Sequence, residues 1–147
     1  LGLQYQRARA LRECAWFIEE RHQGLVPRDL QGLLEIPHVG LYAAHATLCF
    51  AFGERYPVVD ANVVRVLGRL FGKGERGDLR RKKVIWELAW DILPREGYVA
   101  HNYGLLDFGA LVCKTRGPLC EECPLSESCV YRAGLLLAGN PGLPGHG

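Results

Sequence analysis

Apolar residues recur at intervals of three and four along most of this chain, and strict alternation of apolar and polar residues is never sustained. The first interval places apolar side chains on one face of a helix, whereas a half-buried strand requires the second. The pattern therefore predicts an all-α fold. The clearest apolar stripes are Ala8, Leu11, Ala15 and Ile18; Val63, Val66, Leu67 and Leu70; Val84, Leu88 and Ile92; and Leu105, Phe108 and Val112.

Glycine and proline residues mark where these helices end. Gly24 is expected to terminate the first helix, and Pro94 follows the stripe that ends at Ile92. Between these points, a short helix is predicted from about Asp29 to Glu35. A tight turn at 36–40 then leads into a second helix from Tyr42 to Phe52. Two helices joined by such a turn form an αα-hairpin, which is also a common packing unit without chemistry.

The predicted elements divide the chain into three parts. Residues 1–57 form a helical lobe that carries the hairpin, and residues 58–132 form a second helical lobe. Residues 133–147 contain several Gly and Pro residues and a short Leu run, so they are expected to form a poorly ordered tail.

Composition narrows the class of protein. The chain has 147 residues, 48% of them hydrophobic, and no apolar run long enough to span a membrane. The net charge is only +2, so a nucleic-acid partner must be recognised by local patches. The chain begins with Leu1 and contains no methionine, which predicts a fragment or a processed product.

Four cysteines near the C-terminal end, Cys113, Cys120, Cys123 and Cys129, have the spacing C-x6-C-x2-C-x5-C. No secretory signal precedes them, so disulfides are the weakest interpretation. Zinc loops usually supply two close pairs of ligands, whereas this loop has one close pair with an outlier on each side. The spacing favours an iron–sulfur cluster, and zinc remains the alternative. Cys14 and Cys49 lie in apolar helical segments and are expected to be buried small hydrophobes.

Several motifs, in chain order, resemble those of the endonuclease III and adenine glycosylase superfamily of helix–hairpin–helix DNA glycosylases. They are the turn Ile36-Pro37-His38-Val39-Gly40, the segment Pro57-Val58-Val59-Asp60-Ala61-Asn62-Val63, the segment Leu106-Asp107-Phe108-Gly109-Ala110 and the cysteine loop. The resemblance implies the fold of that superfamily without its N-terminal part, and a [4Fe-4S] cluster on the four cysteines. It also implies a base-excision-repair enzyme that acts on double-stranded DNA containing a mismatched or damaged base. We expect a cytoplasmic, nucleoid-associated monomer without membrane contact.

The same resemblance places DNA contacts at the hairpin and elsewhere. Pro37, His38, Val39 and Gly40 would present backbone N–H groups to a phosphate, a contact that reads no sequence. His38 stands where the superfamily usually has glycine, so the turn must accept a histidine at positive φ. Leu3 matches an apolar wedge that relatives insert into the duplex, although a helix-start leucine is more often a packing residue.

Basic residues near the predicted site supply further candidates. Lys114 and Arg116 lie between Cys113 and Cys120, where a rigid loop would present them to phosphate. Arg65 and Arg69 follow Asp60 on its predicted helix and are expected to serve either a phosphate or the helix dipole.

Asp60 and Tyr42 are the catalytic candidates. Aspartate before a helix is a good N-cap, and the resemblance gives this carboxylate the catalytic role. Both interpretations fit a helix N-terminus, which favours an anion. Relatives that also cleave the DNA backbone have an attacking lysine at the position of Tyr42, so tyrosine predicts a monofunctional glycosylase.

The base removed is left open between two branches. The segment from Val59 to Val66 and the segment Trp86-Glu87-Leu88-Ala89 look closer to glycosylases that remove thymine or uracil opposite guanine. The alternative is the branch that removes adenine opposite 8-oxoguanine or guanine. A DNA-binding iron–sulfur module without catalysis is the interpretation from a different class.

Overall fold

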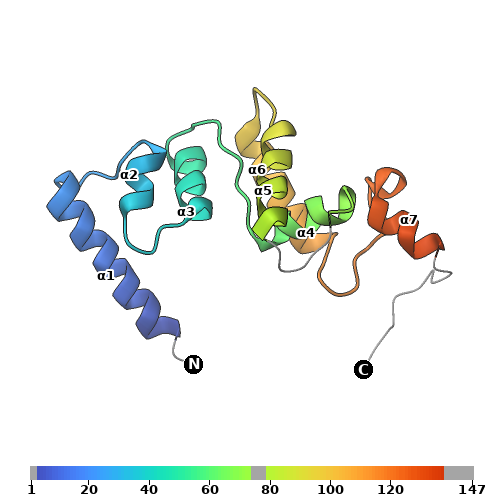
Figure 1. Cartoon of the computed structure of the whole chain (residues 1–147), viewed down its shortest axis with the longest axis horizontal. Coiled ribbons are helices and arrows are strands. Elements are labelled where there is room, and N and C mark those ends of the chain that lie inside the picture. The colour runs from blue at the N-terminus through green and yellow to red at the C-terminus, as the bar shows by residue number, and fades with distance from the viewer. Residues whose placement is uncertain (1–2, 74–78, 138–147) are drawn as a thin grey trace. The chain divides into compact units, whose positions relative to one another are not determined.

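The computed structural model describes residues 3–73 and 79–137, and every regular element in these ranges is helical (Figure 1). The side chains of residue 3 and residues 79–82 lie outside this description. The prediction of an all-α fold is confirmed. The chain separates into two compact units, Leu1–Tyr56 and Pro57–Gly147.

In its described part, residues 3–56, the first unit consists of three helices and a π-helical turn. These are α1 (Leu3–His22), α2 (Leu30–Glu35), α3 (Leu41–Ala46) and η1 (Thr47–Ala51). Gly24 ends α1 as predicted: it adopts a φ of +78°, and its N–H donates to Ile18 O at 3.1 Å. Asp29 caps α2 by accepting the Gly32 N–H at 2.8 Å.

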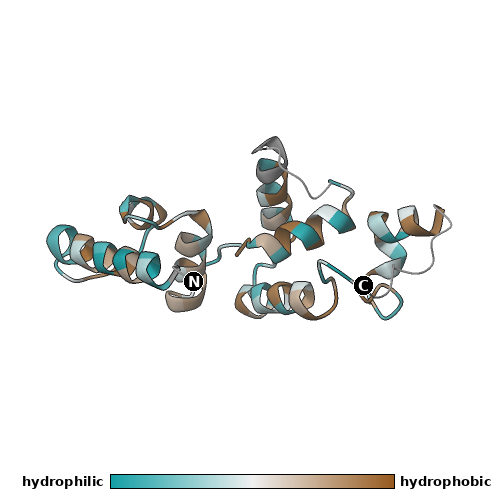
Figure 2. Ribbon diagram, turned by 90° about the horizontal axis from the view of Figure 1, so that it is seen from below, coloured by the Kyte–Doolittle hydropathy of each residue, from teal (hydrophilic) through white to brown (hydrophobic). Residues whose placement is uncertain are grey.

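The face that α1 buries differs from the predicted one. Cys14, Phe17 and Ile18 pack against the core formed by α2 and α3, whereas Leu11 is 71% exposed. Hydrophilic residues occupy much of α1 in Figure 2, so its apolar stripe is weak. A weak stripe fixes the helical period but not the rotation of the helix about its axis. The packing partners, α2 and α3, decide that rotation.

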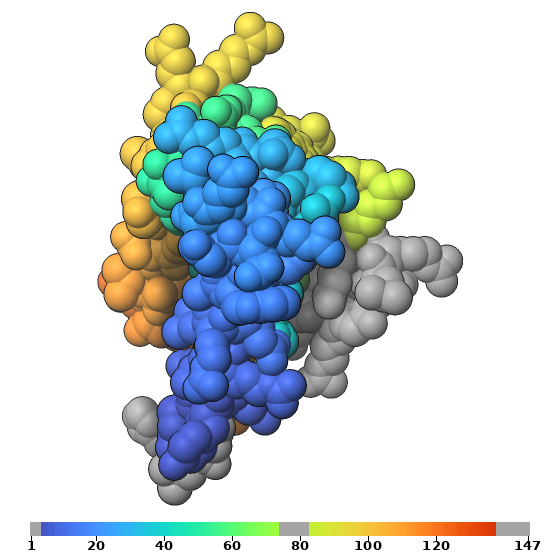
Figure 3. All heavy atoms as spheres, turned by 90° about the vertical axis from the view of Figure 1, so that its left-hand side faces the viewer, coloured from blue at the N-terminus to red at the C-terminus, as the bar shows by residue number. Residues whose placement is uncertain are grey.

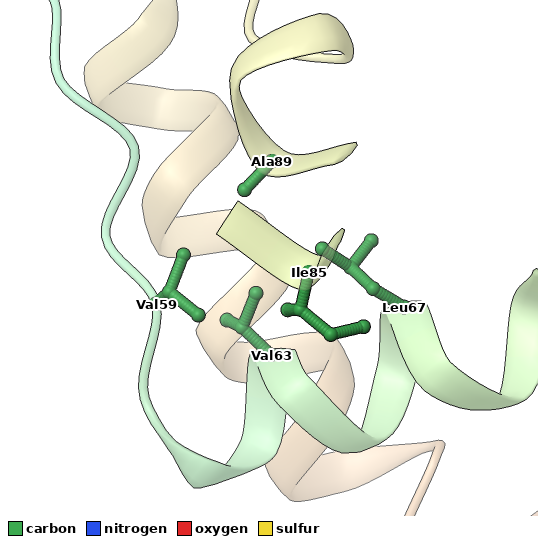
Figure 4. Close-up of a cluster of buried hydrophobic side chains, with 5 residues drawn as sticks. All are labelled: Val59, Val63, Leu67, Ile85 and Ala89. Carbon is green, nitrogen blue, oxygen red and sulfur yellow. The ribbon is translucent and has the colours of Figure 1, made fainter. Parts of the chain in front are cut away.

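The second unit is organised around α4 (Ala61–Leu70). This helix packs against α5 (Leu79–Asp91), α6 (Tyr98–Leu111) and α7 (Val130–Leu137), and the short 3-10 turn η2 (Ser126–Ser128) precedes α7. Figure 4 shows the core between α4, α5 and the segment that enters α4; its members are Val59, Val63, Leu67, Ile85 and Ala89. Val63 and Leu67 are predicted apolar positions, so local periodicity located the contribution of α4. On α5 the buried residues, Ile85 and Ala89, each follow a predicted position by one residue.

Helix α7 corrects the expectation of a tail without structure after Arg132, because it continues to Leu137. The Leu run that looked unstructured in isolation extends a helix that starts in the cysteine loop and packs on α4. Residues 138–147 lie outside the described ranges. Within those ranges, no helix combines the length and the apolar character needed to cross a bilayer.

Candidate active site and cysteine loop

Asp60 is the N-cap residue of α4. Its Oδ1 accepts the Val63 N–H at 2.8 Å, and its Oδ2 accepts the side-chain N–H of Asn62 at 2.7 Å. The segment before it is anchored by buried Asn102 of α6, whose Oδ1 accepts the Val58 N–H at 2.9 Å. Asp60 itself is only half-buried. The carboxylate is therefore held in one orientation at the positive end of a helix while it keeps access to solvent.

A chain of hydrogen bonds runs from Asp60 to the cysteine loop through Asn62 and Arg65. Arg65 donates through Nη2 to Asn62 Oδ1 at 2.8 Å and to Gly109 O at 2.7 Å, and through Nε to Cys113 O at 2.8 Å. This arrangement requires close approach of α4 and α6, because a Cβ atom on Gly109 would lie 2.7 Å from the Cβ of Asn62. Asn62 and Arg65 therefore hold both the Asp60 carboxylate and the start of the cysteine loop in place.

Arg69 lies one turn further along α4 and is 6% exposed. Its guanidinium donates to Lys114 O at 2.7 Å and to Thr115 O at 3.3 Å, and its Nη1 lies 3.6 Å from Cys113 Sγ. It also stacks 4.6 Å from the centre of the Tyr131 ring. The guanidiniums of Arg65 and Arg69 both donate to carbonyls inside the second unit instead of being left free for a phosphate. Arg69 lies in the last turn of α4, which agrees with the helix-dipole alternative.

The four predicted cysteines line one hollow, which also includes Arg69, Tyr131 and Arg132. All four thiols are free. Burial raises the pKa of the Cys120 thiol; Arg132 opposes this shift, and the other three thiols add to it, as expected for groups within electrostatic range. Among the described residues, no three His, Cys, Asp or Glu side chains are grouped closely enough to hold a single metal ion.

The donor set nevertheless suits a thiolate-bound cofactor. Four thiols face a shared hollow, and two arginines lie beside it to balance negative charge. Cys113 Sγ accepts an N–H group from Arg69 at 3.6 Å. The sulfur atoms of iron–sulfur sites are commonly hydrogen-bonded in this way by surrounding protein groups.

The segment between Cys113 and Cys120 is a closed loop. The hydrogen bond from Leu119 N to Val112 O at 3.0 Å closes the loop. The buried Arg69 guanidinium donates to the Lys114 carbonyl within it. Arg116 is exposed, and Lys114 is half-buried. The loop is therefore fixed at both ends, as the prediction for these two basic residues requires.

The hairpin turn lies in the first unit. His38 adopts a φ of +64°, the left-handed conformation that the sequence demanded of a residue in place of glycine. The turn is closed by the bond from Val39 N to Ile36 O at 3.1 Å, and Gly40 precedes α3 in an extended conformation. Pro37 O accepts a hydrogen bond from the Cys14 thiol at 3.0 Å. Histidine therefore fits this turn, which is tied to α1.

The remaining candidates belong to the first unit as well. Tyr42, in the first turn of α3, is 47% exposed, so it is not a core residue. The side chain of Leu3 lies outside the described part of the structure, and its backbone begins α1. The wedge role of Leu3 stays a prediction.

Asn62 and Asn102 are site residues to which the sequence interpretation gave no role. The spacing of Arg65 and Arg69, four residues apart after an N-cap aspartate, did place both on one helix face. It could not show that the face is buried. Nothing in the sequence pairs Asn102 with Val58, which lies 44 residues earlier.

No protein-family model matches the chain. It is 40% identical to the thymine/uracil-DNA glycosylase of Methanothermobacter thermautotrophicus, over 89% of this chain and 59% of that protein. It is 38% identical to the adenine DNA glycosylase of Mycobacterium tuberculosis strain H37Rv, over 86% of this chain and 42% of that protein. The solved structure of a thermostable thymine-DNA glycosylase matches with a TM-score of 0.82 at 40% identity, over 90% of this chain and 61% of the other.

These similarities agree with the hairpin and the capped aspartate described above. The chain belongs to the helix–hairpin–helix DNA glycosylase superfamily. It spans about three-fifths of the length of the thymine/uracil-DNA glycosylase that it resembles.

Proposed function

We propose that this chain is part of a monofunctional DNA glycosylase that removes thymine or uracil opposite guanine. The observation that carries the proposal is the geometry of Asp60, a half-buried carboxylate fixed by two N–H donors at the start of α4. The similarity to a thymine/uracil-DNA glycosylase supports the choice of base.

Hydrolysis of the N-glycosidic bond explains why a fixed carboxylate is needed. As the bond breaks, its electron pair leaves with the base and positive charge develops on the deoxyribose. Asp60 would stabilise that charge and orient a water molecule, whose oxygen bonds to the sugar carbon and whose proton neutralises the departing base. The target base must be extruded from the duplex for this chemistry.

Tyr42 accounts for the monofunctional outcome. A phenol has no amine with which to form a Schiff base on the sugar, so the product is an abasic site and the DNA backbone stays intact. The exposure of Tyr42 allows it to contact an extruded nucleotide.

A [4Fe-4S] cluster held by Cys113, Cys120, Cys123 and Cys129 is part of the proposal. The shared hollow lined by the four thiols supports it. When bound, the cluster would supply a cross-link that fixes the loop, and the excision step above proceeds without it. Lys114 and Arg116 would then contact phosphate from a rigid loop.

The hairpin supplies the second proposed DNA contact. The backbone N–H groups of His38 and Gly40 would bind a phosphate without reading sequence, while the Val39 N–H closes the turn. Removal of adenine opposite 8-oxoguanine is the second candidate function, because the chain is also 38% identical to an adenine DNA glycosylase. A non-catalytic DNA-binding module is the third.

The first test is Asp60→Asn, with Asp29→Asn as a matched control. Both aspartates are N-caps that accept a backbone N–H at 2.8 Å, and asparagine caps a helix about as well as aspartate. Asp60→Asn should therefore preserve the fold and DNA binding while it lowers excision by at least about 100-fold, the effect of losing one electrostatic stabiliser. Asp29→Asn should excise like the wild type. Wild-type turnover by Asp60→Asn would show that Asp60 serves only as the N-cap of α4.

The base is identified with labelled duplexes that carry G:T, G:U or A:8-oxoguanine, each treated with and without alkali. Strand cleavage at T or U only after alkali is the expected result. Cleavage at adenine would select the second candidate. Binding to all duplexes without excision of any base would select the third.

A further inference from the structure

A second feature of the first unit concerns the surface beside the hairpin turn. A shallow hollow is lined by Gln6, Arg7, Arg9 and Ala10 of α1 together with His38 of the turn. These lining residues include two guanidiniums and an imidazole but no carboxylate. Figure 3 shows α1 at the surface, and Gln6, Arg7, Arg9 and His38 are all exposed, so this hollow is open to solvent.

Arg7 carries an unused charge. It is exposed and, in the described part of the chain, forms no ion pair or hydrogen bond. Glu13, one helical turn beyond Arg9, is hydrogen-bonded to Arg9 and His38, so its carboxylate offsets part of the positive charge of the hollow but does not contact Arg7. Arg7 is thus available to an anionic ligand.

Glu13 orients the other two cations. Its Oε1 accepts from Arg9 Nε at 2.7 Å, and its Oε2 lies 2.5 Å from His38 Nε2. These contacts leave the two terminal nitrogens of Arg9 and the Nδ1 of His38 for a ligand. The bond from the Cys14 thiol to Pro37 O also fixes the turn against α1.

The carboxyl group of Glu13 keeps its negative charge to a lower pH than an isolated glutamate does. Hydrogen bonds from His38 and then from Arg9 lower the pKa of its carboxyl group. Glu35, at the end of α2, lines a different hollow with Arg21 and does not compete for this site.

We propose that Arg7, Arg9 and His38 form a phosphate-binding groove for the DNA backbone, with Glu13 as the residue that positions Arg9 and His38. The inference rests on the proposed function. Guanidiniums suit phosphate because they donate several N–H groups in a planar fork. His38 belongs both to the groove and to the hairpin turn, so one DNA strand bound by the turn would continue along α1.

The groove is tested by the salt dependence of binding to an undamaged duplex, measured by fluorescence anisotropy. Each lost phosphate contact lowers the slope of log affinity against log salt concentration by about 0.9. Arg7→Gln and Arg9→Gln should each show this change, and the double variant about twice as much. Arg12→Gln is the matched control, because it removes the same charge from an exposed position of α1 outside the groove. Unchanged salt slopes in the groove variants, or an equal loss of slope in Arg12→Gln, would refute the phosphate-binding groove.

Glu13 is tested by comparing two substitutions that remove the same negative charge. If charge alone matters, Glu13→Ala and Glu13→Gln bind DNA more tightly than the wild type, and to the same extent. If Glu13 positions the cations, Glu13→Ala binds more weakly with a reduced salt slope. Glu13→Gln then recovers part of the loss, because its amide oxygen can still accept from Arg9. Equal tightening in both variants refutes the positioning role.

Substitution of His38 adds an independent measurement. His38→Asn removes the imidazole but keeps a residue that tolerates the positive φ of the turn. This variant should bind the undamaged duplex more weakly, and wild-type affinity would remove His38 from the groove. Thermal melting of each variant verifies the fold. Excision from a G:T duplex is measured in parallel: groove effects without excision by the wild type would refute the proposed enzyme, and excision without groove effects would refute only the groove.

Discussion

Replacing Arg69 with methionine should destabilise the second unit, because this guanidinium holds the base of the cysteine loop. Methionine fills a similar volume but donates no hydrogen bond. The variant loses a charge-assisted bond to Lys114 O at 2.7 Å, weaker contacts to Thr115 O and Cys113 Sγ, and the stacking on Tyr131.

The magnitude follows from these contacts. The short bond from a charged donor contributes about 2 kcal/mol, and the two long contacts together contribute about 1 kcal/mol. The cation–π contact adds about 1 kcal/mol. Burial of an uncharged side chain in place of a cation returns about 1 kcal/mol. The free energy of unfolding should therefore fall by about 3 kcal/mol, which corresponds to a decrease of about 9 °C in melting temperature for a chain of this size.

The assay is thermal and urea unfolding followed by circular dichroism, with iron content measured on the same samples. Arg69→Lys keeps the positive charge but loses the planar guanidinium and its several N–H donors. Its free energy of unfolding should therefore lie between those of the wild type and Arg69→Met. Arg12→Met is the control at an exposed arginine and should stay within about 0.5 kcal/mol of the wild type. If Arg69→Met melts with the wild type and retains the same iron, the role assigned to this buried cation is wrong.

Three further predictions concern other parts of the chain. Tyr42→Lys places an amine where relatives carry the attacking lysine, so borohydride should trap this variant covalently on G:U duplex DNA, whereas the wild type should not be trapped. Absence of trapping would argue against Tyr42 at the site. Gly109→Ala should destabilise the second unit by about 1–3 kcal/mol, because its Cβ would lie 2.7 Å from Asn62 Cβ. Gly104→Ala in the same helix meets no atom within 4 Å and should be neutral or stabilising in the same melting assay. Burial lowers the pKa of His101, and its Nε2 is buried without a partner. The unfolded chain therefore binds this proton more readily, so stability should be full above about pH 6.5 and decline as the pH falls below it. His101→Gln should reduce that decline in urea midpoints measured at pH 7.5 and 5.5; an identical decline would show that other groups cause it.

Features that depend on neighbouring residues could be predicted without a structure. The caps at Asp29 and Asp60, the stop at Gly24 and the positive φ of His38 are all local, since each is set by one residue and the few beside it. Helical periodicity likewise located the buried face of α4, because the apolar stripe of that helix is strong.

The tertiary structure decided the features that depend on distant residues. The weak stripe of α1 did not reveal which face is buried, and α7 formed where the isolated sequence suggested a tail. Arg65 and Arg69 are polar in any sequence-based interpretation, yet they point inward because carbonyls 44 to 48 residues away accept their hydrogen bonds. Burial of a cation is favourable only when such partners surround it, and no local pattern encodes that set of partners.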